Sequence, residues 1–173
     1  MTSRLGDILH ADLPIIDAHH HLIGGSGHVY SIQDYLGDCT SGHLIKASVY
    51  IEVRQNYWKT GPLELRPVGE TEFVANLKEV KDTDDGRIIP RLCSGIIGFA
   101  ELERGDQVEE VLDAHIEAGK GKFRGIRRGV YWSSDPAVYN HVSIKPPPSL
   151  MSDENFKKGF SLLAPKKLSF DAV

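Results

Sequence analysis

Runs of β-branched and aliphatic residues alternate along this chain with segments of helical periodicity, and this alternation restricts the fold more than any other feature. The segments expected to form buried strands are Ile15–Leu22, Ile45–Val53, Ile88–Phe99, Phe123–Trp132 and, at the end, Leu168–Val173. Between them lie the segments expected to form helices, at Ile32–Asp38, Glu70–Lys81, Asp106–Ala118 and Ser152–Leu163. Alternating strands and helices form βα units, which build a parallel sheet covered by helices.

The number of units indicates part of a barrel. A complete (β/α)₈ barrel needs about 250 residues, whereas this chain has 173 and reaches only a fifth strand. We therefore expect an α/β fold in the form of a partial, truncated TIM (β/α)₈-like barrel, with about five parallel strands and flanking helices. Residues 1–173 would form the N-terminal part of one barrel domain that ends in about its fifth strand.

Composition excludes several classes of partner. The net charge of −4 offers no electrostatic case for binding nucleic acid. No apolar run approaches the length of a membrane span, and the N-terminus lacks the apolar core of a signal peptide. The only cysteines, Cys39 and Cys93, have no metal-type spacing and are expected to be free thiols, which predicts a cytoplasmic protein.

The segment Pro14–Leu22 reads PIIDAHHHL, and it indicates a chemical function more directly than any other segment of the chain. On a regular strand Asp17, His19 and His21 would share one face, and His20 would point the other way. Two imidazoles on one face at a strand end would supply two ligands of a transition-metal site. The alternative is that these histidines are ordinary polar residues. The preceding buried strand, the in-phase aspartate and the following glycines favour the metal site.

IIDAHHHL resembles the first-strand signature of the amidohydrolase superfamily, in the form found in the amidohydrolase-related (family 2) metal-dependent hydrolases. That group includes lactonases, 2-pyrone-4,6-dicarboxylate-type lactone hydrolases and some decarboxylases. The resemblance extends from about Leu13 to Ala172 through the segments SVYIEV, GPLELRPVGETEFV, RLCSGIIGFAEL, FRGIRRGVYW and LAPKKLSFDA.

This resemblance implies a distorted TIM barrel in which His19 and His21 are metal ligands. The cofactor would be a divalent metal, with Zn²⁺ the expected ion, although some members of the group work without one. A histidine from a later strand and an aspartate that serves as the base complete the site in metal-dependent relatives. That aspartate would lie beyond Val173, so we expect no catalytic residue within this chain.

Three further positions are candidates for supporting roles. Asp17 would orient the backbone or an imidazole N–H behind the metal ligands, or serve only the fold. Glu52 and Arg127 lie at strand ends, where a barrel collects its binding residues. The Arg127 guanidinium suits a substrate carboxylate, and the alternative is a salt bridge with Glu52 itself.

Alternatives remain for the role of the loop after the second strand and for the function of the whole chain. Arg54, Tyr57 and Trp58 would line the pocket or fold on one another within their loop. The expected function is a metal-dependent hydrolase acting on a small carboxylated lactone, ester or amide. A decarboxylase of the same fold is the alternative enzyme. The other alternative is a catalytically incomplete fragment or weak metal-binding or assembly module, with self-association through exposed barrel edges.

Overall fold

A computed structural model describes residues 8–24, 29–78, 89–140 and 145–173. Its strands are β1 (Pro14–His20), β2 (Leu44–Ile51), β3 (Arg91–Gly98), β4 (Phe123–Arg128) and β5 (Ser169–Ala172). Its α-helices are α1 (Ile32–Cys39), α2 (Val68–Ala75), α3 (Val108–Ala118) and α4 (Glu154–Ser161). Short 3₁₀ turns occur at η1 (Leu63–Leu65), η2 (Leu102–Gln107), η3 (Pro136–Tyr139) and η4 (Leu150–Ser152).

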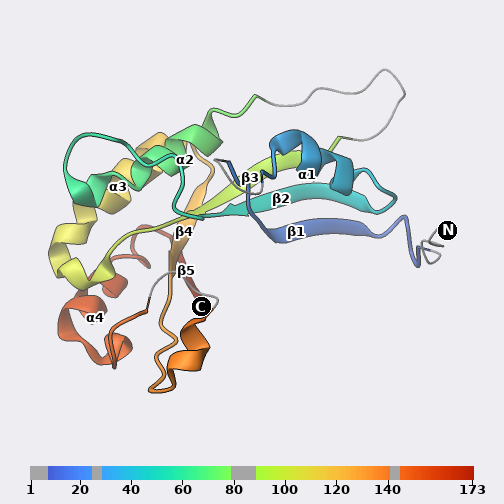
Figure 1. Cartoon of the computed structure of the whole chain (residues 1–173). Helices are drawn as coiled ribbons and strands as arrows, with labels where there is room; N and C mark the ends of the chain where they lie inside the picture. The colour runs from blue at the N-terminus through green and yellow to red at the C-terminus, as the bar shows by residue number, and fades with distance from the viewer. Residues whose placement is uncertain (1–7, 25–28, 79–88, 141–144) are drawn as a thin grey trace.

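The sheet is parallel throughout, and its strands lie in the same order as in the chain, β1-β2-β3-β4-β5. A doubly wound sheet reverses its strand order and places helices on both faces. Without a reversal, successive crossovers stay on one side and the sheet curls around the other. Figure 1 shows α1, α2 and α3 along one side of the sheet and α4 near β4 and β5. The predicted α/β partial barrel is confirmed as a curled half-barrel of five strands.

Local signals set several element boundaries. Ser31 begins α1 through a reciprocal capping box with Asp34. Asp153 caps α4, because its Oδ1 accepts the Phe156 backbone N–H at 2.8 Å. The predicted helix Glu70–Lys81 is wrong at both bounds within the described chain. It starts at Val68, and it ends at Ala75; positions 79–81 lie outside the described residues.

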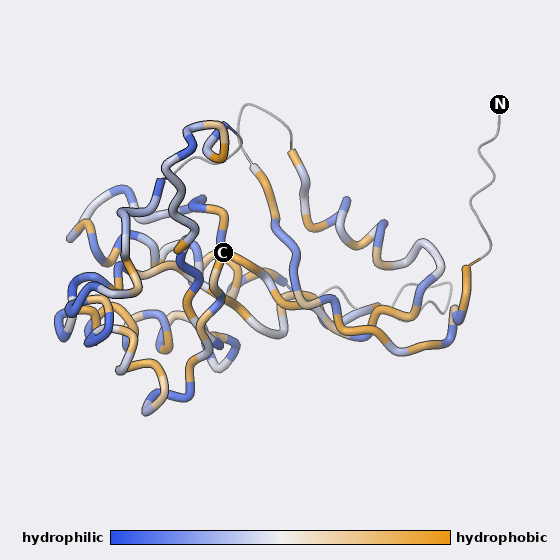
Figure 2. The backbone as a smooth tube through the Cα atoms, turned by 90° about the horizontal axis from the view of Figure 1, so that it is seen from below, coloured by the Kyte–Doolittle hydropathy of each residue, from blue (hydrophilic) through white to orange (hydrophobic). Residues whose placement is uncertain are grey.

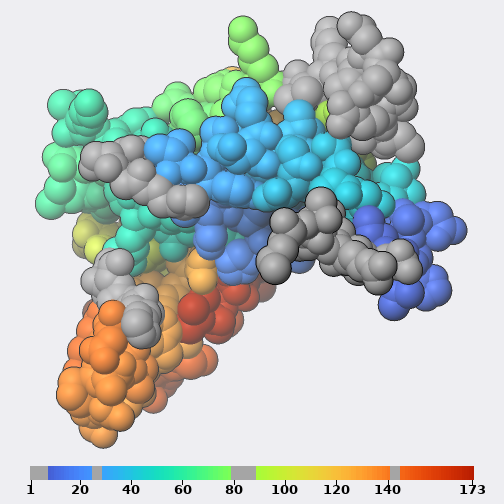
Figure 3. Space-filling view, turned by 45° about the vertical axis from the view of Figure 1, so that its right-hand side comes forward, coloured from blue at the N-terminus to red at the C-terminus, as the bar shows by residue number. Residues whose placement is uncertain are grey.

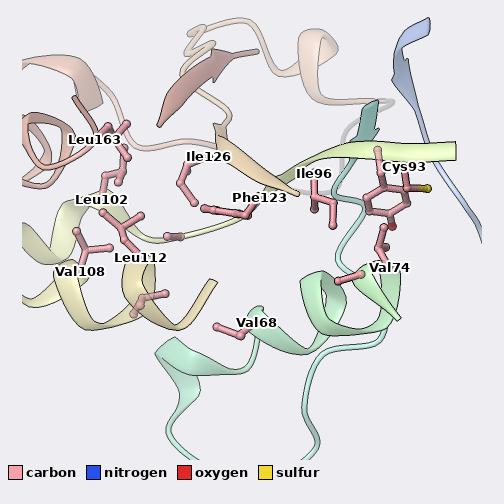
Figure 4. Packing of buried hydrophobic residues seen from close by; sticks show 14 of the residues in the cluster. Val68, Val74, Cys93, Ile96, Leu102, Val108, Leu112, Phe123, Ile126 and Leu163 are labelled. Carbon is pink, nitrogen blue, oxygen red and sulfur yellow. The ribbon is translucent and has the colours of Figure 1, made fainter. Parts of the chain in front are cut away.

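The core lies between the sheet and the helices (Figure 4). Figure 2 shows hydrophobic stretches of chain running along the sheet, where they are covered from the helical side. The largest fully buried apolar side chains come from β2, β3, β4, η2, α2 and α3. They include Tyr50, Ile96, Ile126, Leu102, Val68 and Leu112. Ile116 of α3 is 39 % exposed, because it lies at the margin of the apolar face that Val108, Leu112 and His115 bury.

His115 is a polar residue at the centre of this core, with no exposed surface. Its Nε2–H donates to the Phe99 carbonyl at 3.0 Å, and its Nδ1 accepts the Thr71 hydroxyl at 2.8 Å. The ring also stacks on Phe123, with centroids 4.9 Å apart. Burial lowers the pKa of His115 to about 4, so the ring is neutral and connects α2, β3 and α3. His115 therefore has a structural role in the core.

Acid should destabilise the fold through this histidine. Between about pH 6.5 and about 4, the unfolded chain binds a proton on residue 115 that the folded chain excludes. The free energy of unfolding therefore decreases as pH falls through that window, by at most about 1.4 kcal/mol per pH unit for this group. Urea denaturation at a series of pH values should show a shallower slope for His115→Gln than for wild type. An unchanged slope would contradict the assignment.

The two edges of the half-barrel are β1 and β5, each paired with one neighbour among the described strands. Ile16 of β1 points away from α1 and is 67 % exposed. The chain between β4 and α4, orange in Figure 3, projects from the rest of the molecule in that view. In the described part of the chain, no helix has the length and apolarity needed to cross a membrane.

An edge strand with an exposed isoleucine favours pairing between copies. We expect size-exclusion chromatography with light scattering to show the mean mass rising with protein concentration. Ile16→Lys should reduce this rise, because a charge at an edge opposes strand pairing. Leu63→Lys is the matched control, since Leu63 is 72 % exposed but lies on η1, away from both edges. A wild-type protein that stays monomeric at all concentrations would contradict the expectation.

Candidate functional site

The histidine segment lies at the end of β1, and the strand contains an irregularity there. Asp17 pairs with Ser48 of β2, and His20 pairs with Tyr50. The chain thus advances three residues on β1 for two on β2, which is the signature of a β-bulge. One extra residue shifts the alternation of side chains, so the faces expected for a regular strand do not apply beyond Asp17.

Asp17 lies on the helical side, not beside His19 and His21 as predicted. Its Oδ2 accepts the Tyr35 hydroxyl of α1 at 2.6 Å, and its Oδ1 accepts the His19 backbone N–H at 3.1 Å. The prediction of a shared face is wrong because the bulge changes the phase between Asp17 and the histidines. Asp17 therefore connects the bulged backbone to α1, and its contact with the site passes through the main chain of His19.

His20 also faces α1 and is buried. Its ring stacks on Tyr35 with centroids 3.9 Å apart, and its Nδ1–H donates to the Val49 carbonyl at 2.9 Å. Its Nε2 lies 3.5 Å from the Cys93 sulfur. Burial lowers the pKa of His20 to about 4. A neutral ring held on three sides belongs to the packing between β1 and α1, which agrees with the prediction that His20 points away from the other two histidines.

His19 and His21 meet on the other side of the bulge. Their Nε2 atoms are 3.2 Å apart, and their ring planes are nearly perpendicular at 89°. His21 Nδ1–H donates to the Ile51 carbonyl at 2.8 Å, so its proton is on Nδ1 and the lone pair of its Nε2 faces His19 Nε2. Burial, and then the charge of His21, lowers the pKa of His19. The lowered pKa favours the neutral form of His19, which is the form that ligates metals.

The separation of these two nitrogens fits a metal ion. Two nitrogen ligands at about 2.0–2.1 Å from a tetrahedral Zn²⁺ lie about 3.3 Å from each other. The hydrogen bond from His21 to the β2 backbone is the kind of outer contact that fixes a ligating imidazole. Among the residues that the structure describes, no group of three or more His, Cys, Asp or Glu side chains gathers in a ligating arrangement. The two imidazoles are therefore the whole candidate ligand set within the described residues.

Arg127 on β4 points away from the helices toward Asp171. Its Nε lies 3.7 Å from Asp171 Oδ2, and the two residues are register neighbours on β4 and β5. Arg128, the next residue, pairs on the helical side with Glu103 of η2. Among the described residues, Arg127 thus forms an ion pair with Asp171 and not with Glu52, the partner considered from sequence. The charge of Arg127 lowers the pKa of His19, and the charge of Asp171 raises it.

Asp171 was not among the residues predicted from the sequence. A signal for it was present, because an aspartate next to Phe170 in an apolar strand must face the side opposite that aromatic ring. Phe170 packs on Phe156 of α4, so Asp171 points into the concave side of the sheet. There it moderates the charge of Arg127 and extends the polar group toward the β5 edge.

Glu52 directly follows β2 and is 9 % exposed. Its backbone N–H donates to the Ile97 carbonyl at 2.9 Å, which continues the ladder between β2 and β3. Burial raises the pKa of its carboxyl group, while the charges of Arg54, Arg127 and His21 oppose that rise. Glu52 therefore lies at the carboxyl end of β2, as predicted from its position in the chain.

The loop after β2 is held by a second buried carboxylate, Glu70. Its Oε1 accepts the Tyr50 hydroxyl at 2.8 Å and the Val53 N–H at 2.9 Å, and its Oε2 accepts the Arg54 N–H at 3.2 Å. Arg54 takes a positive φ of 62° at this point. The Arg54 guanidinium then lies 4.4 Å from the Phe99 ring centroid. Sequence reasoning missed Glu70, since a glutamate at a helix start usually faces solvent.

A mainly apolar cavity has a volume of about 600 Å³. It lies between α1, α2 and the segments that follow β1 and β2, and the histidines are not part of its lining. Its apolar lining is formed by Leu22, Val29, Tyr30, Ile32, Phe73 and Leu77. Gln55 closes one side, where its Oε1 accepts the Gly24 N–H at 2.7 Å. Of the predicted glycine loop, Gly25 and Gly27 lie outside the described residues. A cavity of this size accommodates a small organic molecule.

Comparison of the chain with protein-family models, curated proteins and solved structures found no match.

The contacts of Asp17 predict its importance for stability. Asp17→Ala leaves the Tyr35 hydroxyl and the His19 N–H without their acceptor, so we expect the free energy of unfolding to fall by about 1–3 kcal/mol. For Asp17→Asn we expect a smaller fall in the free energy of unfolding, because the amide oxygen still accepts one hydrogen bond. Urea denaturation measures both, with the exposed Asp106→Ala as control. A loss no larger than that of the control would show that the bulge does not depend on Asp17.

Proposed function

We propose that this half-barrel belongs to a metal-dependent hydrolase of the amidohydrolase type, which acts on small carboxylated lactones, esters or amides. The observation that carries the proposal is the pair of His19 and His21 Nε2 atoms, 3.2 Å apart at the carboxyl end of β1. Carboxyl ends of barrel strands are where (β/α)₈ enzymes hold their sites. The resemblance of IIDAHHHL to the amidohydrolase signature supports the same assignment.

The two imidazoles would hold the ion, and Zn²⁺ fits their spacing. A bound Zn²⁺ lowers the pKa of a coordinated water to about 7 and polarises a substrate carbonyl. His21 keeps its Nδ1 proton on the Ile51 carbonyl, so its Nε2 stays available without a conformational change. Asp17 fixes the backbone N–H of His19 and thereby the direction of that ring.

Arg127 would bind a carboxylate of the substrate. Its guanidinium is 3.7 Å from Asp171, a separation that leaves its remaining N–H donors for another oxyanion. A small molecule with an acidic group is therefore the class of substrate that this set of residues supports.

A second candidate is a weak metal-binding or assembly module. It is favoured by the finding that the described residues supply two candidate ligands and no third. A decarboxylase of the same fold would use the same histidines on a carboxylated substrate, and the products distinguish the two reactions. Hydrolysis of a lactone opens the ring and releases one proton, whereas decarboxylation releases carbon dioxide.

The metal-binding part of the proposal is tested by titrating the metal-free protein with Zn²⁺ in a calorimeter. We expect weak binding at one site, because two imidazoles alone chelate the ion, and we expect His19→Ala and His21→Ala each to abolish it. His43→Ala, which removes an exposed histidine far along the chain, should leave binding unchanged. Binding that survives both site variants would refute the assignment of the ligands.

The same variants decide between the candidates for function. Ring opening of carboxylated lactones in the presence of Zn²⁺, lost in His19→Ala, would support the hydrolase. Release of carbon dioxide from the corresponding acids would support the decarboxylase. Zn²⁺ binding without either reaction would favour the module. Turnover that persists in both histidine variants would exclude a metal mechanism at this pair.

A further inference from the structure

The cavity between α1, α2 and the segments that follow β1 and β2 is open to solvent although its lining is mainly apolar. Its volume is about 600 Å³. Val29 and Phe73 line it, and they keep 53 % and 42 % of their surfaces exposed. Large apolar side chains that stay exposed in a concavity indicate a binding site, because a ligand that covers them removes their surface from water.

Hydrogen bonds fix two walls of this cavity. Ile23 and Tyr30 form an antiparallel pair, in which the Ile23 N–H donates to the Tyr30 carbonyl at 2.9 Å and the reverse bond measures 2.8 Å. This pair joins the chain that follows β1 to the chain that precedes α1. The Gly24 N–H donates to Gln55 Oε1 at 2.7 Å, which joins the segment after β1 to the segment after β2. The cavity is thus formed before a ligand arrives, and a preformed site loses less entropy on binding.

The lining of the cavity carries no charge. Among the described residues that line it, Tyr30 is the only one with an ionisable side chain. Its hydroxyl donates to Asp38, and burial together with this hydrogen bond raises the pKa of Tyr30 to about 12, so the phenol is neutral near pH 7. A charged ligand would lose hydration here without gaining an opposite charge, which is costly. The lining therefore favours an uncharged ligand.

Gln55 supplies the cavity with a hydrogen-bond donor. Its Oε1 accepts the Gly24 N–H, so the other terminal atom of the side chain is the amide nitrogen with its two N–H groups. Within the described part of the chain, the Gln55 side chain makes only this bond to Gly24, which leaves both N–H groups available to a ligand. A ketone or ester carbonyl accepts such a bond without carrying a charge. We propose that this cavity binds an uncharged, mainly apolar molecule with a carbonyl group, to which Gln55 donates.

Three naphthalenes that differ in one substituent test this directly: 2-acetylnaphthalene, 2-ethylnaphthalene and 2-naphthoate. Each competes for the full chain, without added metal, with N-phenyl-1-naphthylamine, an uncharged dye whose fluorescence rises in apolar sites. We expect the ketone to bind about 2- to 10-fold more tightly than the ethyl compound, the range for one hydrogen bond between uncharged groups. We expect 2-naphthoate to bind at least about 10-fold more weakly than the ketone, because its charge stays uncompensated. Equal affinities, a preference for 2-naphthoate, or no displacement of the dye would overturn the inference.

Two variants locate the site, each with a matched control. Gln55→Glu keeps an oxygen for the Gly24 N–H but removes the donor, so it should abolish the preference for the ketone over the ethyl compound. Gln107→Glu makes the same change of charge on η2, outside the cavity, and should retain that preference. Phe73→Ala should weaken both uncharged compounds at least about threefold, whereas Leu63→Ala, on the exposed η1, should not. A preference that persists in Gln55→Glu, or unchanged affinity in a folded Phe73→Ala, would refute the assignment.

This site is independent of the proposed hydrolase site. Neither His19 nor His21 lines the cavity, and the carboxylate of the proposed substrate would find no cation among the described lining residues. The double substitution of both histidines by alanine should therefore bind the ketone as tightly as wild type. Loss of ketone binding in this variant would place the ligand at the histidines and overturn the inference. Retained ketone binding, in a protein that hydrolyses no lactone, would support the cavity as a site while the hydrolase proposal fails.

Discussion

One extra residue in β1 determines the arrangement of the candidate site. Without the bulge between Asp17 and His20, regular alternation would direct Asp17 and His19 to the same face. With it, Asp17 and His20 lie against Tyr35 of α1, and His19 approaches His21 on the other side. The bulge costs a regular ladder position, which the hydrogen bond from His19 N–H to Asp17 offsets. Packing of α1 and orientation of the two imidazoles are thus consequences of the same local geometry.

The buried polar side chains are of two kinds: those whose polar atoms all have hydrogen-bond partners and those with an unpaired atom. His115 and Glu70 have all their polar atoms paired, and both connect helices to the sheet. Glu52 and Tyr57 keep polar atoms unpaired in the same interior. A fully paired network rigidifies a fold, whereas unpaired atoms reduce its stability until a ligand or water supplies their partner. Glu70 and Glu52 are thus two buried carboxylates of one region that differ in pairing, since both Glu70 oxygens accept hydrogen bonds and Glu52 Oε2 accepts none.

The parallel half-barrel could be predicted because apolar runs and helical periodicity depend on residues close in the chain. The positions of His19 and His21 near each other agree with their spacing, and their roles stay predictions. The face of Asp17 could not be predicted, since a bulge is set by pairing with β2, a distant segment. Asp171 and Glu70 were missed for a related reason, because their importance comes from Arg127 and Tyr50 on neighbouring strands. Local sequence patterns identify the helices and strands, whereas contacts between distant segments determine which face and which partner each side chain has.

The strand order has a consequence for how the chain folds. Each strand after the first pairs with the one that immediately precedes it in the chain. Every new βα unit therefore finds its partner already synthesised and only a few tens of residues away, so the entropy cost of closing each loop is small. The sheet can grow one unit at a time from its N-terminal edge as the polypeptide leaves the ribosome, with β1 and its histidines ordered first.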